Sequence, residues 1–518
     1  MPGRLRLPRC SLVDLLCLAA PVVVAVWISH TGADADLWGH LRFGADLLAS
    51  HSLSVADRYS FTADTAWINH EWLSEAVLAA TYDNFGAFGL NLLKLAIIGG
   101  IACLTWRTGK ACGGSTFALS WLTALVVAAS YTRTQVLRPQ AFSVLFFVIL
   151  LVLLQERHPN AVAASGASGE RRWSGGRLAI ALATLFMVWA NAHGGWIVGF
   201  ATLALWVAFD VFEQRSVRAF ALGSALIVAA LAGTLVTPYG TKLWMFLHQT
   251  VGLSRDDITD WTPFAKYPIG LIVFELVLPV VALLSMRMCR RWPSARHATV
   301  IGMLALGMYR VGRVDAFMQV AIGMLLAPIL LDAFGRVEER LRRYRRLGTP
   351  YVVHGLVAVA MVIVTAAVAV TRLGHIYIEG TWIPDRDAVR FLRAGSPNTR
   401  LLTWFSWGEY AIWHLSPRGI LVSMDGRRET IYSDRVLADH WAFYKNQGNA
   451  AAYPDAIKAD EIWLPKDLPI VAVLRDRGWH VVYEGDVSIV FSRSAQPSPI
   501  TPRADPASER TPAFFPGP

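Results

Sequence analysis

Apolar runs alternate with short polar loops along most of this chain, up to about residue 371. Most of these runs are long enough, as helices, to cross a hydrocarbon core of about 30 Å. About eleven membrane spans are expected, near residues 11–29, 86–105, 115–131, 140–155, 178–192, 195–212, 219–236, 267–286, 298–309, 314–334 and 351–371. The runs 178–192 and 298–309 are short, and a re-entrant pair there is the alternative to full crossings. The pattern predicts a polytopic α-helical membrane protein.

The basic residues of the loops indicate how the chain is oriented. Arg4, Arg6 and Arg9 precede the first run, and every second loop after it is again basic. Arginine and lysine accumulate in the cytoplasmic loops of membrane proteins. We therefore expect the N-terminus in the cytoplasm, the spans in the cytoplasmic (inner) membrane, and residues 30–85 and the chain beyond 372 outside.

Composition agrees with a membrane protein and excludes several other classes. Of the 518 residues, 54% are hydrophobic and 17% charged, and the mean hydropathy is +0.41. The net charge of +10 comes from arginines in short loops, as membrane orientation requires, so no nucleic-acid partner is expected. The sequence has no Cys-x-x-Cys pair, phosphate-binding loop, dinucleotide motif or Gly-x-Ser-x-Gly turn. Its five cysteines all fall in spans or on the cytoplasmic side, which excludes an external disulfide framework.

Two carboxylates and an imidazole follow the first apolar run directly. Asp34, Asp36 and His40 lie where the chain leaves the membrane on the outer side. From residue 36 to 48 apolar positions recur at helical spacing, which predicts an amphipathic helix along the outer interface. The crowding of charges at a membrane exit favours a functional site over a merely solvated surface.

A second helix is expected later in the same loop. Asn69 is placed to cap a helix that continues through Tyr82, and this helix carries Glu71 and Glu75 one turn apart on a common face. Glu71 is a candidate substrate-binding residue. An ordinary solvated helix face is an equally good interpretation of the two glutamates.

Four arginines are expected in external loops, where the orientation rule would deplete them. They are Arg133, Arg138, Arg310 and Arg313. A guanidinium donates two parallel hydrogen bonds to a phosphate, so these residues are candidates for binding a lipid phosphate. Each one alone is also explained as a charge that reaches from the bilayer to the interface.

Two more external segments contain candidate binding residues. Asn191 and His193 stand at a turn with two glycines, which allow a ligand or a neighbouring backbone to approach closely. Asp260 and Trp261 combine a carboxylate with an aromatic plane, a composition typical of surfaces that bind sugars. A hydrogen-bonded turn and an ordinary interfacial loop are the alternatives.

Beyond residue 372 the composition becomes that of a soluble domain. Strands and helices alternate up to about residue 494, which predicts a small external α/β domain after the membrane module of residues 1–371. Aromatic and charged residues cluster near its predicted strand ends, among them Trp404, Trp407, Tyr410, Asp425 and Arg427. Residues 495–518 are rich in proline and serine and are expected to be disordered.

These features together resemble a known family. A first span from the cytoplasm, an outer loop that opens with an acidic motif and continues through interfacial helices, and many further spans look like the GT-C membrane glycosyltransferases. The resemblance is closest to bacterial enzymes of the protein-mannosyltransferase and lipid-A-core-transferase type, which use polyprenyl-phosphate sugars. It implies that the first acid of the outer loop is the base or holds a metal, and Asp36 aligns best with that position. The usual Asp-Glu pair is absent, because Leu37 follows Asp36 and the second acid is Asp34.

The resemblance implies transfer of a hexose or pentose, with inversion, from a polyprenyl-phosphate donor to a glycan, lipid or protein acceptor of the envelope. Asp36 is the expected base, with Asp34 and His40 in support. The cofactor is left open, with Asp34 and Asp36 as the ligands if a divalent cation is bound. A non-catalytic transporter or scaffold for envelope polysaccharide or lipid is the alternative, in which the same loop only binds.

Overall fold

The fold is taken from a computed structural model, which describes residues 12–53, 56–156, 174–251, 261–343, 351–379, 383–494 and 513–517. The chain divides into two compact units, and each is discontinuous in sequence. The first unit contains residues 1–31 and 91–374, and the second contains residues 32–90 and 375–518.

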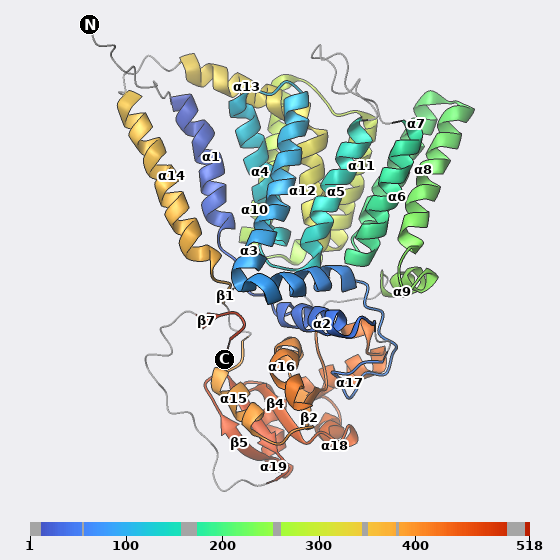
Figure 1. The fold of residues 1–518 in the computed structure, drawn as a ribbon, viewed down its shortest axis with the longest axis vertical. Helices are drawn as coiled ribbons and strands as arrows, with labels where there is room; N and C mark the ends of the chain where they lie inside the picture. The colour runs from blue at the N-terminus through green and yellow to red at the C-terminus, as the bar shows by residue number, and fades with distance from the viewer. Residues whose placement is uncertain are drawn as a thin grey trace. The chain divides into compact units, whose positions relative to one another are not determined.

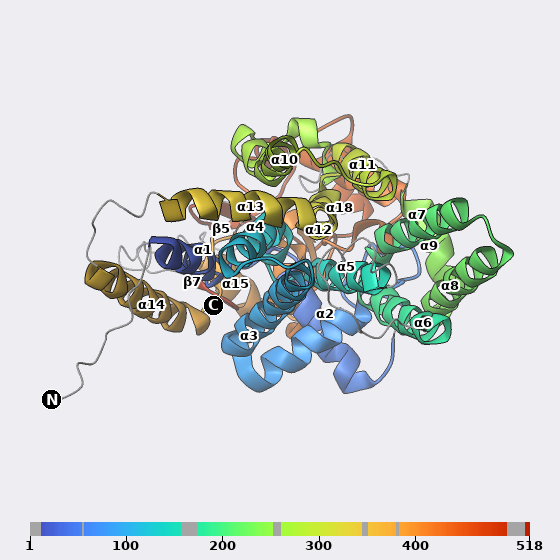
Figure 2. The same cartoon turned by 90° about the horizontal axis from the view of Figure 1, so that it is seen from above.

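The first unit is a bundle of helices that run side by side (Figure 1) and are seen end-on in Figure 2. Its helices are α1 (Leu12–Ile28), the second part of α3 (Trp72–Ala111), α4 (Thr116–Thr134), α5 (Pro139–Glu156), α6 (Gly175–Ala192), α7 (Trp196–Gln214), α8 (Val217–Leu235), α9 (Thr241–Val251), α10 (Ile269–Cys289), α11 (Ala295–Arg310), α12 (Asp315–Leu325), α13 (Ala327–Arg343) and α14 (Tyr351–Leu373). Ten of the eleven predicted spans each overlap one of these helices, and the span 314–334 overlaps two, α12 and α13.

Within the described residues, seven helices are long and apolar enough to cross a membrane. The pair formed by residues 312–325 and 327–343 makes an eighth if it is counted as one span with a bend of 67°. The chain is thus a multi-pass membrane protein, although the expected number of eleven spans is not confirmed. The bend falls within the predicted span 314–334. The sequence predicts one unbroken span there, because hydropathy alone does not locate a break in a helix.

The packing of the first unit separates a buried core from a lipid-facing surface. Phe147, Phe186 and Phe317 belong to one continuous core of buried apolar side chains. By contrast, α14 exposes apolar side chains such as Leu356 and Ile363, whose exposed fractions are 64% and 62%. Exposed aliphatic rows of this kind are stable when lipid covers them.

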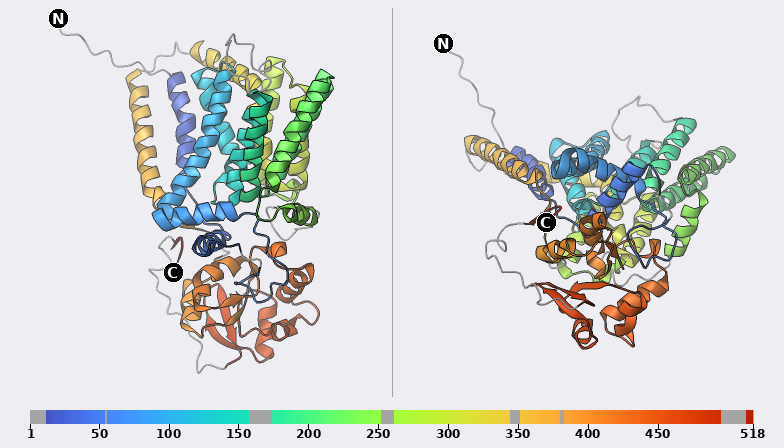
Figure 3. Two further views of the ribbon diagram at one scale, coloured as in Figure 1. Left: turned by 45° about the vertical axis from the view of Figure 1, so that its right-hand side comes forward. Right: turned by 60° about the horizontal axis from the view of Figure 1, so that its bottom comes forward.

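The second unit contains a five-stranded sheet in the order β3-β2-β4-β6-β5. Strands of this sheet are drawn in orange and red in Figure 3. The strands are β2 (Arg400–Thr403), β3 (Leu421–Val422), β4 (Glu461–Pro465), β5 (His480–Glu484) and β6 (Ser488–Ser492). Strand β2 pairs in parallel with β3 and β4, whereas β6 is antiparallel to both β4 and β5. The same unit contains the helices α15 (Arg386–Ala394), α16 (Gly408–Leu415), α17 (Asp434–Tyr444) and α19 (Ile470–Asp476). The predicted α/β domain is confirmed as a small sheet region.

The first outer loop belongs to this second unit. Its helix α2 (Leu37–Ser50) forms where the amphipathic pattern predicts it and packs against α16. Ser60 makes a β-bridge with Val422. The sequence grouped this loop with the membrane module, because contacts between segments so far apart leave no local pattern.

The end of the chain is also part of the second unit. Strand β7 (Ala513–Phe514) pairs antiparallel with β1 (Tyr377–Ile378). The ring of Phe515 lies 4.9 Å from that of Trp38, and the Trp38 indole N–H donates to the Pro516 carbonyl at 2.8 Å. The expected disorder of residues 495–518 is therefore wrong for residues 513–517, because two adjacent phenylalanines supply apolar surface that composition alone did not weigh. Residues 495–512 lie outside the described residues.

Candidate functional site

The acidic motif of the outer loop lies at the start of α2, within the second unit. The Asp34 carboxylate accepts a hydrogen bond from the backbone N–H of Asp36 at 3.0 Å, so Asp34 shapes the turn. Asp36 occupies the N-cap position of α2, but its side chain makes no capping hydrogen bond. The Asp36 carboxylate is therefore directed to other neighbours, whereas Asp34 has a local structural role.

A second carboxyl group stands beside Asp36 and comes from α16. A Cβ atom placed on Gly426 would lie 2.7 Å from Asp36 Oδ1 and 2.6 Å from Glu409 Oε1, so the two carboxyl groups flank the same glycine. A Cβ on Gly39 would collide with Glu409 Oε2. Two glycines thus make the space in which Glu409 sits beside Asp36.

Glu409 is deeply buried, and the charges that act on it are mainly those of other acids. Its exposed fraction is 4%, and its Oε2 has no hydrogen-bond partner among the described residues. Burial raises the pKa of Glu409 well above its usual value, the carboxylates of Asp36 and Asp425 raise it further, and the charge of Arg427 opposes them. Nothing in the local sequence singles out Glu409, because an acidic residue in the first turn of a helix is common.

A third group of side chains has the composition of a metal site. Ligand atoms of His40, Glu71 and Glu75 lie within 4.8 Å of one another. His40 Nδ1 is 3.2 Å from Glu75 Oε1, and the Asn69 amide donates to Glu75 Oε2 at 2.5 Å. Burial alone would lower the pKa of His40, but the hydrogen bond with Glu75 and the nearby acids outweigh it and raise that pKa. An imidazole with two carboxylates suits a divalent transition metal. This trio, not Asp34 with Asp36, is the possible metal-binding group found in the described part of the chain.

Arg427 connects the outer loop to the C-terminal segment of the second unit. Its guanidinium binds Asp425 through two nitrogens, at 2.9 and 2.7 Å, and donates to Asp57 of the outer loop. It also lies 4.7 Å from the ring of Phe43 and 4.7 Å from that of Trp67. The sequence indicates Asp425 and Arg427 as members of one cluster near predicted strand ends. Their partner Asp57 lies 370 positions before Arg427, so no local pattern connects the two residues.

The external arginines lie in the first unit and have different surroundings. The Arg133 guanidinium binds the fully buried Asp315, with Nη2 at 2.8 Å, and also donates to the Tyr267 hydroxyl. Arg313 lies over the ring of Trp261 at 5.0 Å, so two of the predicted binding residues are brought together. Arg138 is half-buried at the start of α5, and Arg310 is exposed at the end of α11.

Asn191 and His193 are held by hydrogen bonds within the first unit. The Asn191 amide donates to the Val236 carbonyl at 2.9 Å, and His193 Nδ1 contacts the Ser143 hydroxyl at 2.7 Å. A Cβ on Gly195 would lie 2.6 Å from the same hydroxyl, so a glycine is needed here for the turn to pack closely against Ser143. The other predicted sugar-facing residue, Asp260, lies outside the described residues.

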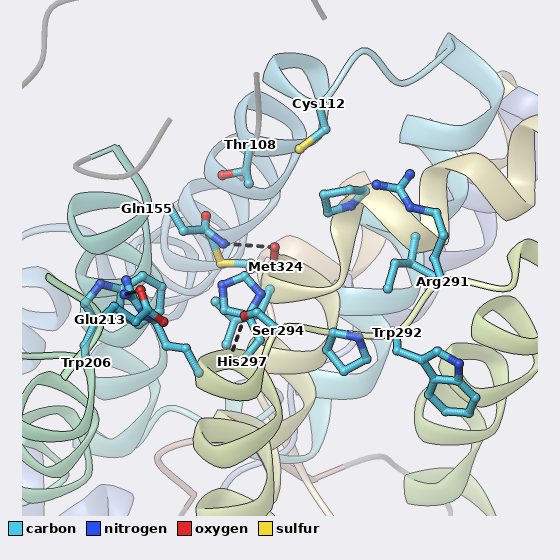
Figure 4. A pocket seen from close by; sticks show the side chains of 15 residues that line it. Thr108, Cys112, Gln155, Trp206, Glu213, Arg291, Trp292, Ser294, His297 and Met324 are labelled. Carbon is cyan, nitrogen blue, oxygen red and sulfur yellow. Dashed lines mark hydrogen bonds and ion pairs between the residues drawn. The ribbon is translucent and has the colours of Figure 1, made fainter. Parts of the chain in front are cut away.

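A cavity of about 460 Å³ opens in the first unit (Figure 4). It is lined by Arg291, Trp292 and His297, with Trp206 and Gln155 among the other side chains. Arg291 belongs to a loop that the sequence places in the cytoplasm. None of the predicted site residues lines this cavity.

Sequence searches of protein-family models and of curated proteins find no match to this chain. Comparison of the fold with solved structures does find similar proteins. The oligosaccharyltransferase AglB of Archaeoglobus fulgidus, in complex with an inhibitory peptide and a dolichol-phosphate, is 12% identical with a TM-score of 0.53, over 93% of this chain and 75% of that one. ArnT of Cupriavidus metallidurans, bound to undecaprenyl phosphate, is 15% identical with a TM-score of 0.51, over 92% of this chain and 98% of that one.

A further structure of the Archaeoglobus fulgidus oligosaccharyltransferase contains zinc and sulfate, and matches over 91% of this chain and 73% of that one, with a TM-score of 0.50 and 12% identity. At these levels of identity, the similarity establishes the fold. The resemblance to GT-C membrane glycosyltransferases that the outer loop and the spans suggested is confirmed at that level.

Proposed function

We propose that this chain, which has the fold of the GT-C membrane glycosyltransferases, transfers a sugar from a polyprenyl-phosphate donor to an envelope acceptor at the outer face of the cytoplasmic membrane. The observation that carries the proposal is the Asp36 carboxylate, which leaves its helix end uncapped and stands beside the buried Glu409. The solved structures with similar folds bind undecaprenyl phosphate or dolichol-phosphate, which supports a lipid phosphate as the donor group.

Asp36 is the proposed base. Its carboxylate takes the proton of the acceptor hydroxyl while the acceptor oxygen bonds to the anomeric carbon of the sugar. The bond from that carbon to the phosphate oxygen breaks, and its electron pair leaves with the polyprenyl phosphate. A single displacement of this kind inverts the anomeric centre. A positioned base contributes about 10²–10⁴-fold to the rate of such a step.

Arg138, Arg310 and Arg313 are the proposed ligands of the donor phosphate. A leaving phosphate gains negative charge, and guanidinium groups stabilise it through charge-assisted hydrogen bonds. Arg133 is less suited to this role, because the buried Asp315 already neutralises it. The contact of Arg313 with Trp261 supports a surface that accepts both a phosphate and a sugar face.

A divalent cation is compatible with this chemistry. His40, Glu71 and Glu75 would hold it, as their ligand atoms already lie within reach of one ion. Such an ion would supply positive charge to a developing phosphate or lower the pKa of a bound hydroxyl. Zinc in the similar oligosaccharyltransferase structure supports testing this ion first.

The alternative is a scaffold or transporter that binds the lipid phosphate without breaking a bond. The experiment uses the full chain in nanodiscs with a panel of undecaprenyl-phosphate-linked hexoses and pentoses and an envelope extract as acceptor. Release of undecaprenyl phosphate is followed by mass spectrometry. We expect release from at least one donor, dependent on the extract. Binding of the lipids with no release from any of them would favour the scaffold.

A further inference from the structure

We propose that Glu409 is a positioning residue for Asp36, and that it acts as a neutral carboxylic acid which donates a hydrogen bond to the Asp36 carboxylate. The inference rests on the proposed role of Asp36 as base. It assigns to the C-terminal segment a group of the catalytic site, whereas the sequence placed all catalytic candidates in the outer loop.

The position of Glu409 is set by close packing on two sides. Gly39 in α2 and Gly426 after β3 leave space that any larger residue would fill with a Cβ atom. Gly408, the residue before Glu409, is itself packed against the backbone of Met424 and Asp425. The Glu409 side chain is therefore closely confined, and its Oε1 and the Asp36 Oδ1 lie against the same glycine, Gly426.

The charged side chains that act most strongly on Glu409 are mainly acids. Besides burial, the carboxylates of Asp36, Asp425 and Glu75 raise the pKa of Glu409, and the charge of Arg427 opposes them. Arg427 is itself bound by two carboxylates, those of Asp425 and Asp57. The amino end of α16 favours negative charge, but its effect is smaller than that of burial beside like charges. Burial and these neighbouring acids favour the protonated form of Glu409.

A neutral Glu409 has two effects on Asp36. A hydrogen bond to the charged form of a carboxylate favours that form, so Asp36 stays ionised and ready to accept a proton. The bond also fixes the rotation of the Asp36 carboxylate toward the acceptor hydroxyl. During transfer Asp36 gains the acceptor proton and Glu409 keeps its own, and one proton must leave to solvent before the next cycle.

The first test uses glutamine, which copies the shape and the donor of a protonated glutamic acid. In the release assay with undecaprenyl-phosphate sugars, Glu409→Gln is expected to keep kcat within about threefold of wild type. Glu409→Ala, which loses the donor, should lower kcat by about tenfold with little change in KM. Equal loss in both variants would show that an ionised Glu409 is required and would overturn the proposal.

The second test does not depend on turnover and so separates this proposal from the proposed function. Infrared spectra of the full chain at neutral pH should show the carbonyl stretch of a protonated carboxyl group, and Glu409→Gln should remove part of it. Asp36→Asn removes the neighbouring negative charge, so the Glu409 band should then titrate away at lower pH. Glu461→Gln is the matched control, because burial raises the pKa of Glu461 to about 7 in the same unit. Its own band should be insensitive to Asp36→Asn. An unchanged band in Glu409→Gln would overturn the proposal whether or not turnover is found.

Discussion

Arg427 donates a hydrogen bond to Asp57, a residue 370 positions earlier in the chain. The same guanidinium is held by Asp425 and lies against the rings of Phe43 and Trp67. The contact joins the first outer loop to the C-terminal segment, and both lie in the second unit. Since α2 follows Asp36 in that loop, the Arg427 cluster helps to fix the place of the proposed base.

Replacing Arg427 should destabilise the second unit. Arg427→Ala leaves the buried carboxylates of Asp57 and Asp425 without their cation, and breaking a buried ion pair costs roughly 3–5 kcal/mol. A lower Tm is expected in thermal unfolding followed by tryptophan fluorescence. Arg435→Ala is the control, because the Arg435 side chain is 90% exposed and should leave the Tm unchanged. Equal Tm values for both variants would show that the cluster does not stabilise the fold.

The end of the chain should stabilise the helix that follows the acidic motif. Phe515 is 6% exposed, and its ring lies 4.9 Å from that of Trp38 and 5.4 Å from that of Tyr82. Removing a buried phenylalanine ring costs roughly 3–5 kcal/mol. Phe515→Ala should thus lower the Tm by several degrees, whereas Phe85→Ala, at a residue 69% exposed, should not. The same Tm in both variants would mean that the terminal segment contributes nothing to stability.

The pH dependence of stability follows from the buried glutamates. Burial, with a smaller effect of Asp460, raises the pKa of Glu461 from 4.5 to about 7. Between these values Glu461 binds more protons in the folded chain than in the unfolded chain, so its contribution to stability falls as pH rises from 4.5 to 7. Glu409, whose pKa is also raised, acts in the same direction. Glu461→Gln should lessen the fall in Tm across this window, and the exposed Glu339→Gln should not. Equal pH dependence of the Tm in wild type and Glu461→Gln would contradict the shift of Glu461. The wild-type Tm alone does not test it, because burial lowers the pKa of His414 and His440 to about 4, and these histidines make stability rise with pH.

Arg133 and Arg313 should behave differently when each is changed to alanine. Arg133→Ala leaves Asp315 buried without its partner, so it should reduce the yield and Tm of folded protein. Arg313→Ala should leave the Tm close to wild type and weaken binding of undecaprenyl phosphate about tenfold or more, since a hydrogen bond to a charged group is worth about 1.5–3 kcal/mol. Arg313→Lys should rescue only in part, because it lacks the planar fork. Unchanged affinity in Arg313→Ala would remove it from the phosphate site.

The sequence predicted the elements of this fold well, because each depends on a local pattern. Apolar runs located the helices of the bundle, and helical spacing from residue 36 located α2. The alternation of strands and helices after residue 372 identified the region that forms the small sheet. In each case the signal lies within about twenty neighbouring residues.

The assembly of the site was not predictable in the same way. Glu409 lies beside Asp36 only because Gly39 and Gly426 make room for it, and no spacing in the sequence links these four residues. Arg133 was a candidate phosphate ligand by its expected loop, yet it pairs with Asp315 on another helix. Such contacts depend on which faces of distant elements meet, and one sequence does not record that.

The most direct test of the central claim is the rate at which the full chain, in nanodiscs, releases undecaprenyl phosphate from a sugar-linked donor, compared between wild type, Asp36→Asn and Asp34→Asn. Asn keeps the volume of Asp but cannot take a proton. We expect Asp36→Asn to lower the rate by about 10²–10⁴-fold, with Tm and donor binding preserved. Asp34→Asn should retain most activity, because the Asp34 carboxylate accepts a hydrogen bond within the turn and is not the proposed base. A rate near wild type for Asp36→Asn would contradict the assignment of Asp36 as the base, and full activity in both variants would contradict a catalytic role for this loop.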